Sequence, residues 1–227
     1  MPNSSVDTYI VDGNITIFLG AHSDVFKQDI VYSSLLGQLV SNAHDIASDA
    51  WLNSYRKTLG TLYWLTKSSA NQNLKRQSAS VLKLSKPTLA NRLSGTELAQ
   101  LSDALGSIKN LPKDSDALAA LMNRIQQGNE LATYTVCPLL TVICANKTVI
   151  SLRLMFDTRH PVDVAILDEE ISEKESLNGP QINQWITYLA EEKYVSVRHK
   201  IIEKLGSRIT TLLHHITPAG KTAHLGA

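Results

Sequence analysis

The pattern of apolar residues is strongest over residues 27–65, where two stripes follow one another at spacings of three and four. The first stripe contains Val31, Leu35, Leu36, Leu39, Val40 and Ala43, and the second contains Trp51, Leu52, Tyr55, Leu59 and Leu62. Such spacing is typical of helices with one buried face. It predicts a helix over 29–43 and a second helix capped by Ser48 or Asp49. With Trp64 directly behind them, these two helices are expected to organise the core.

Alternating patterns elsewhere predict strands. Residues 8–19 alternate around Asp12, Gly13 and Asn14, which is a strong hairpin signal because aspartate and glycine tolerate the positive φ of a tight turn. Further strands are predicted over 81–84, 134–136, 139–145, 149–156, 162–167 and 181–189. Asn146 and Lys147 supply a second hairpin turn.

Three more helices are predicted from capping and periodicity. Ser94 and Glu97 form a capping box that opens a helix with Leu98, Leu101, Leu105 and Ile108 facing inward, and Pro112 ends it. A helix over 114–127 is closed by Gly128. A long last helix covers 191–216. Between them, residues 65–92 are mostly polar.

Hairpin strands separated by pairs of helices favour an α+β fold. We expect an antiparallel β-sheet built from hairpins, with helices packed mainly on one side and a long C-terminal helix. No repeat or linker divides the sequence, so a single domain over 1–227 is predicted, with a flexible tail at 217–227.

Composition narrows the class of protein. Hydrophobic residues make up 43% and charged residues 19%, which is typical of a globular protein, and the net charge of +1 predicts no general attraction to nucleic acid or acidic membranes. No apolar run approaches the roughly 18 residues of a transmembrane segment. Residues 1–14 lack the features of a signal peptide, so a cytoplasmic protein is expected.

The two cysteines, Cys137 and Cys144, are expected to be free and buried. On one extended strand they would lie about 23 Å apart and on opposite faces. Only a turn at Pro138 would bring them within bonding distance.

No motif for catalysis, cofactor binding or metal binding is present. The sequence lacks phosphate-binding, dinucleotide-binding, nucleophile-elbow and HExxH motifs. The seven histidines are scattered along the sequence, at His22, His44, His160, His199, His214, His215 and His224. The adjacent pair among them, on a helix, would point about 100° apart. We therefore predict no catalytic residue, no cofactor and no metal.

Charged residues are unevenly distributed. Residues 50–96 contain no acidic side chain but eight basic ones, namely Arg56, Lys57, Lys67, Lys75, Arg76, Lys83, Lys86 and Arg92. The absence of aromatic residues over 66–96 argues against nucleic acid as their partner. The counterpart of this basic stretch is an acidic cluster later in the sequence, formed by Asp168, Glu169, Glu170, Glu173 and Glu175. Consecutive carboxylates in a polar loop are usually solvated, and that is the first interpretation. Acid–base catalysis is a second, and a third is that they meet the basic stretch, within the chain or across a dimer.

An enzymatic alternative rests on Asp157, Arg159 and His160, which follow the strand predicted to end at Phe156. Side chains at a strand end often gather into sites, and a hydrolase or transferase would need them to converge. The same four-residue run, 157–160, is also a good turn.

Three stretches resemble a small bacterial family. They are residues 29–31 with 35–39, the aromatic pattern from Trp51 to Trp64, and residues 202–208. The chain is similar there to MakC/MakD-type accessory proteins encoded beside tripartite α-pore-forming toxins, which are exported through the flagellar apparatus. The resemblance implies a cytosolic helper of toxin production or export, with toxin subunits as protein partners and no enzymatic role. The sequence leaves the oligomeric state, the partner and the molecular role open.

Overall fold

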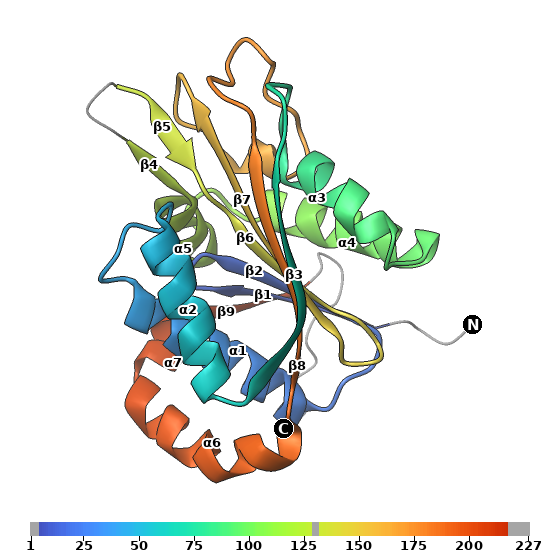
Figure 1. Ribbon diagram of the computed structural model, residues 1–227, viewed down its shortest axis with the longest axis vertical. Coiled ribbons are helices and arrows are strands. Elements are labelled where there is room, and N and C mark those ends of the chain that lie inside the picture. Colours follow the sequence, from blue (N-terminus) through green and yellow to red (C-terminus); the bar gives the residue numbers. More distant parts are fainter. Residues whose placement is uncertain (1–4, 129–131, 218–227) are drawn as a thin grey trace.

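A computed structural model of the chain describes residues 5–128 and 132–217 (Figure 1). Its strands are β1 (Val6–Val11), β2 (Asn14–Leu19), β3 (Trp64–Asn73), β4 (Gln126–Gly128), β5 (Tyr134–Val136), β6 (Leu139–Ile143), β7 (Val149–Thr158), β8 (Gln181–Leu189) and β9 (Leu213–Ile216). Its α-helices are α1 (Asp24–Ser41), α2 (Asp49–Thr61), α3 (Val81–Ala90), α4 (Gly95–Lys109), α5 (Asp116–Ile125), α6 (Glu191–Leu205) and α7 (Arg208–Leu212), and η1 (Val164–Leu167) is a 3₁₀-helix.

The sheet runs in the order β3-β8-β7-β6-β2-β1-β9, with β5 pairing the far end of β7 and β4 pairing β5. Neighbours are antiparallel except β2 and β6, which are parallel. The predicted α+β class with a mostly antiparallel sheet is therefore confirmed. β3 and β9 are the two ends of this order.

Helices cover both faces of the sheet, which differs from the expected placement on mainly one side. α1, α2 and α6 cover one face, where Phe18, Leu139 and Trp185 are buried. α3, α4 and α5 cover the other, where Ile17 and Leu140 are buried (Figure 1). Because successive strand residues point to opposite faces, a strand buried on both sides shows no alternation, and the sequence pattern could not reveal the second layer.

The two central helices form as predicted. Ser48 Oγ accepts a hydrogen bond from Trp51 N at 3.1 Å and caps α2. Ser23 caps α1, which begins at Asp24, five residues before the expected start. Trp51 stacks on Tyr55 with ring centroids 5.1 Å apart. A Cβ at Gly37 of α1 would lie 3.0 Å from the Tyr55 ring, so glycine allows the two helices to approach closely.

The predicted N-terminal hairpin is confirmed. β1 and β2 pair in register around Asp12 and Gly13, both of which have positive φ. Asp12 is buried, and its carboxylate accepts hydrogen bonds from Arg124 of α5 at 2.9 Å and from Asn42 at 3.1 Å. The turn therefore also anchors helices from both layers.

The polar segment after α2 contains elements that the sequence did not indicate. Residues 64–73 form β3, and the strand predicted over 81–84 is wrong, because these residues begin helix α3. Ser80 Oγ accepts from Lys83 N at 3.2 Å and caps that helix. Pro87 lies inside α3 without ending it.

Two predictions near the middle of the chain are also wrong. Gly128 does not cap a helix: α5 ends at Ile125, and Gly128 lies in β4. Residues 164–167 form the 3₁₀-helix η1 rather than a strand, with Asp163 accepting from Ala165 N at 2.9 Å. The capping box of Ser94 and Glu97 and the turn at Asn146 and Lys147 are confirmed.

The long helix predicted over 191–216 is broken. Gly206 has φ +52°, which ends α6, and the chain continues as α7 and then as β9, which pairs with β1. The flexible tail predicted over 217–227 lies, apart from Thr217, outside the described residues. The single domain over 1–227 stays a prediction. No helix in the described part of the chain is long and apolar enough to cross a membrane.

Candidate functional site

The loop between β7 and β8 carries the acidic residues of 168–175 and two members of the enzymatic alternative, Arg159 and His160. It forms an open depression of about 500 Å³. Its lining is Thr158, His160, Pro161, Val162, Asp163, Ala165, Ile166, Glu169, Glu170, Ile171 and Glu175. Apolar side chains thus share this depression with four carboxylates and one imidazole.

The residues of the enzymatic alternative do not converge in this depression. Asp157 accepts hydrogen bonds from Thr135 at 2.7 Å and from Asn178 at 2.6 Å, which tie β5 and the loop to β7. Arg159 Nε donates to the carbonyl of Lys174 at 3.2 Å. The His160 side chain is 78% exposed and lies 3.9 Å from Glu175. Each residue therefore has separate contacts.

The acidic loop meets the basic stretch within the chain, as one interpretation of the sequence proposed. Glu170 Oε2 lies 2.7 Å from Lys83 Nζ and accepts from Ser78 Oγ at the same distance. These hydrogen bonds lower the pKa of Glu170. Arg76 donates to the carbonyls of Glu173 and Lys174. The loop is thus held against the segment between β3 and α3.

A second ion pair fastens the same loop to α4. Lys109 Nζ lies 2.9 Å from Asp168 and 3.0 Å from Glu169, and hydrogen bonding to these two carboxylates raises the pKa of Lys109. Two of the four carboxylates that line the depression, Glu169 and Glu170, are therefore partners of lysines. Thr158, the hydroxyl in its lining, donates to the carbonyl of His160 at 2.7 Å, so this hydroxyl is also used within the loop.

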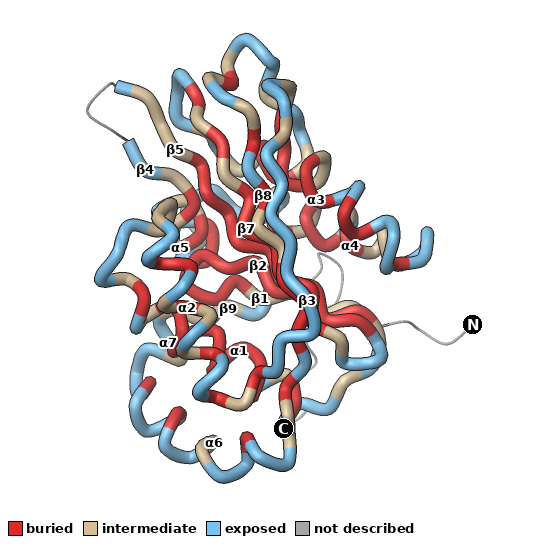
Figure 2. The backbone as a smooth tube through the Cα atoms, viewed as in Figure 1, coloured by how far each residue is buried: buried red, intermediate tan, exposed pale blue. Residues whose placement is uncertain are grey.

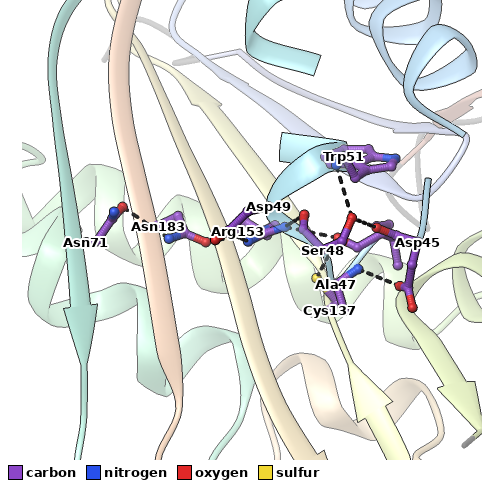
Figure 3. A network of polar contacts seen from close by, with 10 residues as sticks. Asp45, Ala47, Ser48, Asp49, Trp51, Asn71, Cys137, Arg153 and Asn183 are labelled. Atoms are coloured by element: carbon purple, nitrogen blue, oxygen red, sulfur yellow. Dashed lines mark hydrogen bonds and ion pairs between the residues drawn. The ribbon is translucent and has the colours of Figure 1, made fainter. Parts of the chain in front are cut away.

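A separate polar network lies on the opposite face of the sheet, around Arg153 of β7 (Figure 3). The Arg153 side chain is only 1% exposed. It donates to the carbonyls of Ile46 and Ser48 at 3.1 and 2.7 Å, to Asn183 Oδ1 at 2.9 Å and to Asp49 Oδ1 at 3.2 Å. One buried guanidinium therefore fixes the loop that leads into α2. Sequence reasoning missed this residue.

Histidines are dispersed through the fold. His22 stacks on Phe26, and burial lowers its pKa. His214 and His215 lie on β9 rather than on a helix, and His215 stacks on Tyr9. Residues 5–128 and 132–217 hold no group of three or more histidine, cysteine, aspartate or glutamate side chains arranged to bind a metal.

Both cysteines are free and buried, as predicted. Burial raises the pKa of Cys137 to about 12 and that of Cys144 to about 11. Because the thiolate is the reactive form, we expect negligible reaction of the native protein with a disulfide reagent near about pH 8. In denaturant both thiols should react. Rapid labelling of the native chain, measured by absorbance, would contradict this burial.

A different surface is formed by β3, which the polar sequence of residues 64–73 did not indicate. Only Trp64 at its start is buried, and the other nine residues of the strand are exposed (Figure 2). Leu65 and Tyr188 lie opposite each other on β3 and β8 and are 39% and 38% exposed. Lys67 Nζ sits 5.1 Å from the centre of the Tyr188 ring.

Comparison with known proteins gives remote structural similarity. No protein-family model and no curated protein sequence matches the chain. Among solved structures, the chain is similar to the Evf virulence factor, with a TM-score of 0.35 and 12% identity, covering 86% of this chain and 82% of that one. It is also similar to the activated Cyt2Ba monomer from Bacillus thuringiensis subsp. israelensis, with a TM-score of 0.40 and 12% identity, covering 76% and 94%. Neither similarity is close enough to carry a function to this chain.

Proposed function

We propose that the protein acts by binding another protein, as a non-enzymatic accessory protein that supports production or export of a pore-forming toxin. The observation that supports binding is the uncovered strand β3, a row of exposed residues that ends the sheet. An edge of this kind is a ready template for a second polypeptide. The connection with a toxin rests on the sequence resemblance alone.

The polar groups of the chain support binding over catalysis. Asp157, Glu170 and Arg153 each hold one part of the fold against another through hydrogen bonds within the chain. A hydrolase or transferase site that uses nucleophilic catalysis needs a nucleophile, a base and an orienting group within reach of one substrate atom. Asp157, Arg159 and His160 have separate partners instead.

Deleting the gene from its native host tests this proposal. Toxin subunits are then measured in the cytosol and in the medium. A role in export predicts subunits that accumulate inside and fall outside, and a role in production predicts a fall in both. Unchanged levels in both fractions would contradict the proposal.

Complementation separates binding from the enzymatic alternative. The wild-type chain and the His160→Ala variant should restore toxin levels equally, because His160 is exposed and its nearest charged partner, Glu175, lies 3.9 Å away. If the variant folds normally and fails to complement, an activity at residues 157–160 becomes the better explanation.

A further inference from the structure

The outer edge of β3 is open to solvent along its length. Among residues 5–128 and 132–217, β3 pairs with β8 only, and it ends the sheet order. In Figure 2 the strand crosses the front of the molecule as an almost continuous exposed segment. Because a strand has hydrogen-bonding groups on both of its sides, one set of backbone groups on β3 has no neighbouring strand.

A hydrogen bond at the end of the strand identifies these groups. Leu74 N donates to the Pro180 carbonyl at 2.8 Å, which makes Leu74 and Pro180 a hydrogen-bonded pair across the two segments. In an antiparallel ladder such pairs alternate with pairs that point their backbone groups outward. Counting back along the regular register, Ser69, Asn71 and Asn73 direct their N–H and C=O groups away from β8.

The two halves of the strand differ in how they are protected against pairing. A register shift between Thr66 and Ser68 interrupts the first half, and Lys67 lies there. Bulges and lysines are devices that keep edge strands from pairing. Residues 68–73 run in regular register without charge or proline, so this half is free to accept a strand.

Charge decides between a second copy of this chain and another polypeptide. Lys67 and Lys75 are exposed at the two ends of the open half. Antiparallel pairing of two copies about Asn71 would place Lys67 of each copy opposite Lys75 of the other. Like charges opposite one another are unfavourable. Lys83, another lysine of the basic stretch, is already paired with Glu170 and so does not enter this comparison.

We propose that the outer edge of β3 binds an extended, acidic segment of a partner protein, which adds to the sheet as a further strand. The backbone groups of Ser69, Asn71 and Asn73 hold the segment, and Lys67 and Lys75 attract its carboxylates. This inference rests on the proposed function, since it names the kind of partner and the place where it binds.

The probe is a blocked peptide of alternating threonine and glutamate, as long as β3, and its control carries lysine for each glutamate. Hydrogen exchange of the full chain followed by NMR should show slower exchange at the amides of Ser69, Asn71 and Asn73 with the acidic peptide only. Equal effects of both peptides, or protection elsewhere, would overturn the proposal. So would protection of the same amides without peptide together with a dimer in sedimentation.

Matched variants locate the contact. Ser69→Pro removes one outward N–H and should weaken peptide binding about fivefold to tenfold, whereas Ser69→Thr keeps the N–H and should bind normally. The pair Lys67→Glu and Lys75→Glu should weaken binding about tenfold or more at low salt, but Lys57→Glu, a charge reversal on α2, should not. Unchanged binding by Ser69→Pro would overturn the proposal.

The same variants separate this inference from the proposed function. In the native host, Ser69→Pro should lower toxin levels as gene deletion does, while Ser69→Thr should complement. If deletion has an effect and Ser69→Pro complements fully, the accessory role stands and the β3 edge is not its binding site. If deletion has no effect, the accessory role itself fails.

Discussion

Replacing Arg153 with alanine is expected to lower the free energy of unfolding by about 3–5 kcal/mol. The substitution removes the guanidinium donors from the carbonyls of Ile46 and Ser48 and opens a cavity beneath the loop before α2. Urea unfolding followed by tryptophan fluorescence measures the loss, since Trp51 lies in the first turn of α2, beside this loop. Cys137, whose thiol contacts the Ile46 carbonyl at 3.6 Å, should also become more accessible to thiol reagents.

Asp49→Ala is the matched control for Arg153. Asp49 is the charged partner in the network, but its side chain is 88% exposed, so its loss should cost less than about 1 kcal/mol. Arg153→Lys keeps the charge but not the fork of donors, and it should fall between the two. Equal effects of Arg153→Ala and Asp49→Ala would show that the buried hydrogen bonds contribute little.

Replacing Arg198 with alanine is expected to cost about 3 kcal/mol. Arg198 of α6 binds both carboxylate oxygens of Asp29 on α1 at 2.7 Å, and the Asp29 side chain is only 2% exposed. Without arginine a buried carboxylate stays unpaired. The Arg198 side chain is 32% exposed, so water can enter the space that it leaves. The loss of stability should therefore lie at the lower end of the about 3–5 kcal/mol that is typical of breaking a buried ion pair.

A double-mutant cycle with Asp29→Asn tests the origin of this effect. Removing the charge as well should recover part of the stability lost in Arg198→Ala, because the remaining amide is cheaper to bury than a carboxylate. Glu191→Ala, which removes the half-exposed partner of Lys147, should change stability by less than about 1 kcal/mol. Strict additivity of Arg198→Ala and Asp29→Asn would argue against coupling between these two side chains.

Elements with one buried face were predictable from the sequence. The stripe from Trp51 to Leu62 gave α2, and the capping box of Ser94 and Glu97 gave α4, because each pattern records a local physical requirement. The β1–β2 hairpin followed from Asp12 and Gly13 for the same reason. In these segments, local preference and tertiary packing favour the same structure.

Where local preference and tertiary packing favour different structures, the apolar pattern predicted the wrong element. β3 is exposed on both faces, so it shows no apolar alternation, and its conformation comes from pairing with β8. The apolar periodicity of α6 continues past Gly206, although the backbone turns there and residues 213–216 join the sheet beside β1.

The surroundings of the candidate sites were only partly predictable. The opposite charges of residues 50–96 and 168–175 indicated their contact, and Glu170 does pair with Lys83. Arg153 had one available signal, a single charge within the apolar run of residues 149–156, and such a residue requires partners inside the protein. The identity of those partners depends on the loop at residues 45–48, more than a hundred positions away, which no local pattern encodes.

The sheet order also constrains how the protein is made. β2 lies between β1 and β6, and β1 lies between β2 and β9, so the first hairpin pairs with residues 139–143 and 213–216. A ribosome must synthesise most of the chain before either neighbour exists. Closing such long loops is slow, on the order of milliseconds to seconds for sheets dominated by non-local pairs. The nascent hairpin therefore leaves the ribosome with both of its edges exposed, and chaperone binding at this stage would protect the cell from its aggregation.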